Sequence, residues 1–106
     1  VNVPPVGIIS LNETPGKFSL SQNYPNPFNP ETKIKYSLPG NNELYNIVSL
    51  KIYDVSGKLA ANVVNTEQRS GVYEISFDAN NLSSGVYFYK LDAGKFTETK
   101  KMILIK

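Results

Sequence analysis

The chain has 106 residues, of which 41% are hydrophobic and 19% charged, and it contains no Cys, His or Trp, so it is long enough for one domain with an ordinary core. The lack of Cys and His excludes disulfides, thiolate and imidazole metal ligands, and the usual nucleophile–base pairs of enzymes. A formal charge of +2 is too mild for a nucleic-acid-binding protein, and the longest apolar run, residues 102–105, is far shorter than the roughly 20 residues of a transmembrane segment.

Residues 1–17 contain three prolines and two glycines among scattered aliphatic residues, a composition that interrupts helical and strand periodicity alike. We interpret this segment as a linker from a preceding cargo domain, with part of it packed either on the domain that follows or on whatever precedes it. The N-terminus has no Met, no basic region and no apolar stretch of a signal peptide. We therefore expect the chain to be a piece of a longer protein.

From Phe18 onward, apolar and polar residues alternate in short runs, which is typical of strands with one buried face. Seven runs fit this pattern, at residues 18–20, 33–38, 48–52, 58–65, 73–77, 86–91 and 96–105. Clusters ending in Gly at residues 57, 71, 85 and 94 predict tight chain reversals. No run has helical spacing, and we find no internal repeat. The pattern predicts an all-β fold, a seven-stranded antiparallel immunoglobulin-like β-sandwich.

The same alternation predicts the core, because every second residue of a half-buried strand faces inward. Eight side chains are expected to share one core: Ile34, Tyr36, Val48, Leu50, Ile52, Ile75, Phe77 and Tyr87. Leu82, Gly85 and Tyr87 also match a tyrosine corner, in which the phenol hydroxyl bonds a backbone group a few residues upstream.

Polar residues just before this corner offer a second interpretation. The oxygens of Asp78, Asn80 and Asn81 are of the kind that ligate Ca²⁺. However, EF-hand spacing and a cluster of three acidic residues are both missing, so turn formation is favoured and no cofactor or metal is expected. The sequence also shows no combination of nucleophile, base and oxyanion donors, so we do not expect an enzyme.

Three prolines alternate with asparagine and two aromatic residues in one unusual segment: Asn23, Tyr24, Pro25, Asn26, Pro27, Phe28, Asn29 and Pro30. Each proline fixes its own φ and keeps the preceding residue out of the α region, so the segment is ordered before folding. We favour a rigid connector whose Tyr24 and Phe28 fill the end of the sandwich. The alternative is a polyproline-type docking epitope.

Positive charge gathers in the last part of the chain, where residues 86–106 hold five lysines and two acidic residues. Residues 1–85 hold six basic and seven acidic residues. The chain ends within its last predicted strand, and this end contains Lys100, Lys101 and Lys106. These lysines either protect a sheet edge from aggregation or orient a partner that recognises the strand by edge pairing.

Three ordered motifs carry a family resemblance: Asn23–Pro30, then Ile52–Lys58 with Leu82–Tyr87, then Gly94 through the terminal Lys-Met-Ile-Leu-Ile-Lys. Together they make residues 18–106 similar to the type A C-terminal sorting domain of the type IX secretion system. The resemblance implies an immunoglobulin-like sandwich, residues 18–106, that directs a cargo protein across the outer membrane. The cargo, covalently linked ahead of residues 1–17, would pass through the periplasm and become secreted or attached to the cell surface.

The resemblance also implies partners and recognition residues. The partners would be the type IX translocon and the outer-membrane shuttle and sortase proteins, with the chain itself a monomer. The recognition residues would be the Gly-x-Tyr motif and the glycine-then-lysine terminal motif with its strand, namely Gly85, Tyr87, Gly94, Lys100, Lys101, Met102, Ile103, Leu104, Ile105 and Lys106.

The alternative function is an immunoglobulin-like accessory or carbohydrate-binding structural module of a larger extracellular enzyme. Such a module needs an exposed aromatic platform. By alternation, the candidates are Tyr45, Tyr53 and Tyr89, each of which would serve equally well as partly buried cover over the sheet.

Overall fold

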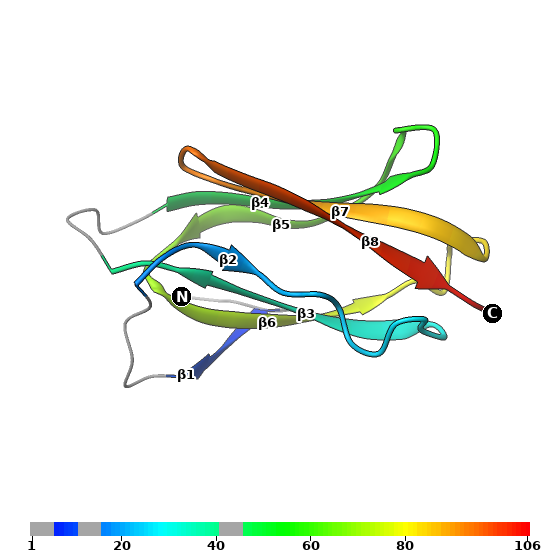
Figure 1. Ribbon diagram of the computed structural model, residues 1–106, viewed down its shortest axis with the longest axis horizontal. Coiled ribbons are helices and arrows are strands. Elements are labelled where there is room, and N and C mark those ends of the chain that lie inside the picture. The colour runs from blue at the N-terminus through cyan, green and yellow to red at the C-terminus, as the bar shows by residue number, and fades with distance from the viewer. Residues whose placement is uncertain (1–5, 11–15, 41–45) are drawn as a thin grey trace.

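The fold is a sandwich of two antiparallel sheets, seen edge-on in the computed structural model of Figure 1, which describes residues 6–10, 16–40 and 46–106. Within these residues there are eight strands: β1 Val6–Ser10, β2 Ser19–Leu20, β3 Glu31–Leu38, β4 Asn46–Asp54, β5 Leu59–Gln68, β6 Gly71–Asp78, β7 Gly85–Ala93 and β8 Phe96–Leu104. One sheet, sheet A, has the order β1-β6-β3-β2, and the other, sheet B, has the order β5-β4-β7-β8. The all-β, immunoglobulin-like prediction is confirmed.

The core lies between the two sheets and follows the alternation of the sequence. All eight predicted core residues are buried. In sheet A, Ile34 pairs with Ile75, and Tyr36 pairs with Tyr73, whose rings stack with centroids 5.4 Å apart. In sheet B, Leu50 lies opposite Leu91 at the centre of the β4–β7 pair. Burying a side chain of this size stabilises the fold by about 1.5 to 3 kcal/mol.

Strand β1 is a correction to the predicted seven strands. The seven predicted strands all form as β2 to β8, and β1 is an additional strand inside the predicted linker. It pairs antiparallel with β6, with Val6 opposite Ile75. The proline and glycine content of residues 1–17 concealed this strand, because Val6–Ser10 is short and is flanked by turn-forming residues.

The two sheets carry the same corner at corresponding points of β6 and β7. The Tyr87 hydroxyl donates to the Ser83 carbonyl at 2.7 Å, which confirms the predicted tyrosine corner. The Tyr73 hydroxyl donates to the Arg69 carbonyl at 2.8 Å, again four residues upstream. Both corners are built on the sequence Ser-Gly-Val-Tyr, at residues 70–73 and 84–87, so one local motif makes the same turn in both sheets.

The glycine in each Ser-Gly-Val-Tyr motif is required by its backbone conformation. Gly71 has φ of 152° and Gly85 has φ of 154°, values that L-residues rarely adopt. Each glycine begins its strand two residues before the corner tyrosine. The Gly-x-Tyr motif therefore sets the direction in which each strand enters its sheet.

Candidate functional site

Strand β8, which holds most of the predicted recognition residues, is an edge strand of sheet B and pairs with β7. Its side chains alternate between two environments: Met102 and Leu104 are buried in the core, while Lys101 is exposed. Ile103 lies partly exposed on the outer face with Lys101. The predicted recognition strand therefore anchors itself with one face and displays the other.

The outer edge of β8 is occupied by residues 22–28, which we call the 22–28 segment. Phe28 forms a parallel bridge with Leu104, in which the Phe28 N–H donates to the Ile103 carbonyl and the Ile105 N–H donates to the Phe28 carbonyl, both at 2.9 Å. The Ile103 N–H donates to Asn26 Oδ1 at 2.9 Å. Edge pairing by a partner along residues 103–105 would first have to displace this segment.

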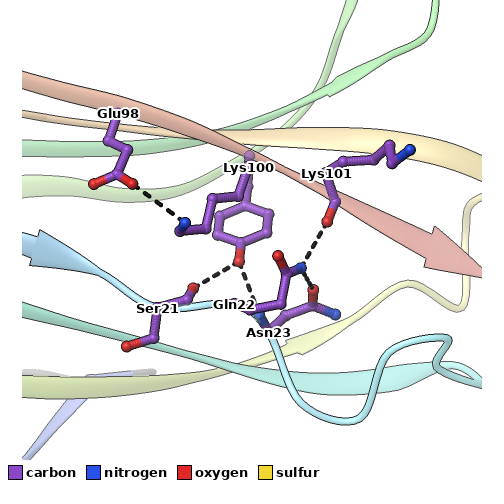
Figure 2. A network of polar contacts seen from close by, with 7 residues as sticks. Ser21, Gln22, Asn23, Glu98, Lys100 and Lys101 are labelled. Carbon is purple, nitrogen blue, oxygen red and sulfur yellow. Dashed lines mark hydrogen bonds and ion pairs between the residues drawn. The ribbon is translucent and has the colours of Figure 1, made fainter.

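Gln22 extends this covered edge toward the middle of β8, as Figure 2 shows. Its Nε2 donates to the Lys101 carbonyl at 2.7 Å and to Asn23 Oδ1 at 2.7 Å. Because outward backbone groups alternate along an antiparallel strand, Thr97 and Thr99 carry the next outward-facing groups of β8. Within the described part of the chain these groups have no partner strand. The open part of the edge is therefore short.

The proline-containing motif is a connector, as we favoured, but its two aromatic residues differ. Phe28 is buried, with its ring 6.5 Å from that of Phe77. Tyr24 is 79% exposed, so the expectation that it fills the end of the sandwich was wrong. The Tyr24 backbone instead bonds that of Lys33 in both directions, at 2.9 and 3.0 Å. The motif thus joins β3 of sheet A to β8 of sheet B.

Two buried polar residues hold the start of this connector in place. Asn23 Nδ2 donates to Thr32 Oγ1 at 3.0 Å and to the Pro25 carbonyl at 3.1 Å. The Thr32 hydroxyl donates to the same carbonyl at 2.9 Å. Their hydrogen bonds compensate the cost of burying both side chains.

Tyr89 links the same segment to the centre of sheet B. Its hydroxyl donates to the Ser21 carbonyl at 2.7 Å and accepts from the Asn23 N–H at 2.8 Å. Burial of the ring raises the pKa of Tyr89 to about 12, although the hydrogen bond from the Asn23 backbone opposes this shift. Tyr89 is fully buried and cannot belong to an aromatic platform.

The three lysines of the predicted tail have different surroundings. Lys100 Nζ lies 3.2 Å from Glu98 Oε2 in an ion pair drawn in Figure 2. Lys106 Nζ donates to the carbonyls of Asn80 and Leu82, at 2.7 and 3.0 Å, so it ties the end of β8 to the loop before the Tyr87 corner. Lys101 is exposed. Of the three, it is the one that presents its charge to solvent without a described partner.

Other predicted residues form turns. Gly94 has φ of 60° in the turn between β7 and β8. Asp54 Oδ1 accepts from the Ser56 hydroxyl, the Ser56 N–H and the Lys58 N–H, at 2.7, 2.9 and 3.0 Å, and these bonds, first of all that from the Ser56 side chain, lower the pKa of the exposed carboxyl. These two turns position the strands on either side of them.

The oxygen-rich loop before the corner also has a turn role. Asp78 Oδ1 accepts from the Asn80 N–H at 2.9 Å. Across the described ranges, no three acidic residues gather in a way that would hold a metal ion. Of the platform candidates, Tyr53 is partly exposed on the outer face of sheet B, and Tyr45 lies outside the described residues. Among the described residues, no helix is long and apolar enough to cross a membrane.

Sequence reasoning missed Gln22, and it placed Asn26 in the proline-containing motif without its contact to β8. It also missed the contacts of Lys106 with the 80–82 loop. The spacing of Asn26 between two prolines was the available signal, because a fixed backbone aims a short amide side chain in one direction. Its partner, Ile103, lies at the other end of the sequence, and no local pattern identifies it.

Comparison with known families gives one match over most of the chain. A family model described as the secretion system C-terminal sorting domain matches residues 22–106. The match begins at the residue where the 22–28 segment begins and includes β3 to β8. No curated protein and no solved structure matches the chain.

Proposed function

The chain belongs to the family of secretion system C-terminal sorting domains of type IX secretion, and we propose that it directs a cargo protein, linked ahead of it, across the outer membrane through that system. Domains of this family mark proteins for export across the outer membrane, so the destination is the cell surface or the medium. The family consists of sorting signals and is not an enzyme family. We assign the chain no catalytic role.

The observation that carries this proposal is that β8 is held in place along its core face and its backbone edge, while its remaining side chains face outward. Met102 and Leu104 fix the strand in the core, and the 22–28 segment fixes its outer edge. A strand fixed on both sides presents its outward side chains in one conformation, which lowers the entropy cost of recognition. We propose that Lys101 and Ile103 are read directly from this display.

In this proposal, the other predicted recognition residues hold β8 in position and are not themselves read. Gly85, Tyr87 and Gly94 shape the turns at the two ends of β7. Lys106 fastens the tail to the 80–82 loop, and Lys100 is balanced by Glu98. A receptor in the translocon, or a shuttle protein that delivers the cargo to it, would meet a rigid strand whose position these residues determine.

We propose that residues 1–17 connect the cargo to the sandwich and that a sortase protein releases the domain by cleavage in or before this segment. Strand β1 supports a specific form of that proposal. Because β1 pairs with β6, the connection lies at the edge of sheet A, whereas β8 lies in sheet B. Strand recognition and cargo attachment therefore use different sheets.

The test is a reporter protein fused ahead of the chain and expressed in a host with an active type IX system. Deleting Lys101–Lys106 removes Met102, Leu104 and the Phe28 bridge, so we expect both folding and export to be lost. Lys101→Glu leaves every described hydrogen bond in place, so we expect a folded domain with reduced export. Its matched control is Lys95→Glu, an equal change at an exposed lysine in the β7–β8 turn. Full export of the folded Lys101→Glu fusion would show that Lys101 is not read.

A further inference from the structure

The outer face of sheet B, which includes Lys101, carries two further lysines that the roles above do not use. Lys51 lies directly opposite Lys90 in the β4–β7 register. Their sequence neighbours Leu50, Ile52 and Tyr89 are fully buried, so both lysines face away from the core. Like charges directly opposite each other in a sheet are destabilising.

Lys101 adds a third positive charge to the same face. It pairs with Phe88, which is the side chain next to Lys90 on that face of β7. The ion pair between Lys100 and Glu98 does not involve this face, because these two residues alternate with Lys101 and therefore lie on the other side of β8. The acidic residue nearest in register is Asp92, opposite Ser49, which is the next side chain after Lys90 on this face of β7 and makes no described ion pair with these lysines.

An apolar band lies beside these lysines. Tyr53 is opposite Phe88 in β7 and opposite Leu59 in β5, so these three side chains form one row across the sheet. Val86 and Ile103 form the next row. Leu59 is 50% exposed, and the other four are partly exposed. None of the described segments covers this band, as the open upper surface of sheet B in Figure 1 illustrates.

We propose that this outer face is a docking surface for an acidic protein surface that has apolar side chains at its centre. The proposal rests on the proposed function, because it identifies the chemistry of the export partner. Charge complementarity carries it: three lysines that outnumber the neighbouring Asp92 and make no described ion pair gain energy when an acidic surface approaches, and their mutual repulsion is relieved. Tyr53 and Phe88 supply the aromatic centre that protein interfaces favour.

A protein partner fits this face better than a lipid surface does. The apolar side chains stand in the pleat of a sheet and are partly buried by their neighbours. Membrane binding uses apolar side chains that are buried several ångströms into the headgroup region. A flat, partly buried row lies flush against another protein but reaches little depth in a bilayer.

The test compares two double charge reversals in the reporter fusion. Lys90→Glu with Lys101→Glu changes the proposed surface, and Lys17→Glu with Lys33→Glu makes the same change in net charge on the side of sheet A, where both lysines are exposed. Each variant is first shown to keep the wild-type melting temperature within a few degrees. We expect the sheet B variant to lower export by about tenfold or more, equivalent to at least about 1.4 kcal/mol, and the sheet A variant to be exported like the wild type.

Equal losses in the two double variants would overturn the proposal, because net charge alone would then explain the effect. Full export of the folded sheet B variant would overturn it as well. Failure of the wild-type fusion to be exported would instead count against the proposed function, so the two failures are distinguishable.

Two further measurements separate the apolar band from the charges and the protein partner from a membrane. Phe88→Ala keeps every lysine, and we expect it to lower export at unchanged secondary structure. Wild-type export by Phe88→Ala would overturn the claim that the apolar row takes part. Binding of the purified chain to vesicles of equal parts phosphatidylcholine and phosphatidylglycerol, abolished by the Lys90→Glu, Lys101→Glu change, would overturn a protein partner in favour of a lipid surface.

Discussion

Phe28 and Leu104 form a parallel bridge that joins the proline-containing motif to the last strand of the chain. The Phe28 ring is buried and its backbone makes two hydrogen bonds to the flanking residues Ile103 and Ile105. One residue therefore serves both the core and the edge of sheet B. The first and the last of the three family motifs meet at this contact. The last residues of the chain are therefore part of the folded domain and do not form a separate extended peptide.

Phe28→Ala should destabilise the domain strongly, because it removes a fully buried aromatic ring and loosens the segment that covers β8. Phenylalanine-to-alanine changes in cores cost about 3 to 5 kcal/mol. Urea unfolding measures the loss, and hydrogen exchange should show faster exchange of the Ile103 and Ile105 amides. A cost close to that of an exposed substitution such as Tyr24→Ala would contradict this assignment.

The two tyrosine corners should contribute separately to stability. Tyr73→Phe and Tyr87→Phe each remove one hydrogen bond to a backbone carbonyl, which costs about 1 kcal/mol. The corners lie in different sheets and share no described partner, so the double variant should show the sum of the two losses. Tyr53→Phe is the control, since no described hydrogen bond involves that hydroxyl. A stability change for the control as large as for the corners would argue against the corner assignment.

Stability should fall at alkaline pH because two buried phenols resist ionisation. Burial raises the pKa of Tyr89 to about 12 and raises that of Tyr36 well above the ordinary value of 10.0. The folded state then holds its protons more tightly than the unfolded state, so this stabilisation is complete below about pH 10 and decreases as pH rises toward 12. Denaturant midpoints measured from pH 8 to 12 check the trend.

Tyr89→Phe is the matched variant for that experiment. It should weaken the alkaline dependence, and at neutral pH it should cost about 1 to 3 kcal/mol because the buried Asn23 N–H loses its acceptor. A variant with the same alkaline midpoint as the wild type would show that Tyr89 does not contribute to the pH dependence.

Substitutions of Lys106 and of Lys101 should have different effects on the stability of the domain. Lys106→Met removes the two hydrogen bonds to the 80–82 carbonyls and should cost about 0.5 to 1 kcal/mol, since the contact is exposed to solvent. Lys101→Met removes no described contact of its side chain and should leave the melting temperature unchanged. Equal melting temperatures for the two variants would contradict a structural role for Lys106.

Local pattern was sufficient to predict seven strands and the eight core residues, because a half-buried strand repeats every two residues. The Tyr87 corner was predictable for the same reason, since its partner is four residues away. The Tyr73 corner was equally local, and the repeated Ser-Gly-Val-Tyr at residues 70–73 would have identified it.

Contacts between distant parts of the chain could not be predicted in this way. The position of the 22–28 segment on β8 depends on how the two sheets pack, and neither Asn26 nor Ile103 carries a local sign of the other. The different roles of Lys100, Lys101 and Lys106 depend on Glu98 and on the 80–82 loop in the folded state. Their charge was evident from the sequence, but their surroundings were not.

The central claim is that this chain is itself the export signal, and it is tested most directly by the location of a reporter fused ahead of it. The measurement is digestion of the reporter by protease added to intact cells, in one host with an active type IX system and in a matched host without it. We predict digestion in the first host and protection in the second. Digestion in both hosts, or protection in both while the fusion is stable and folded, would contradict the account.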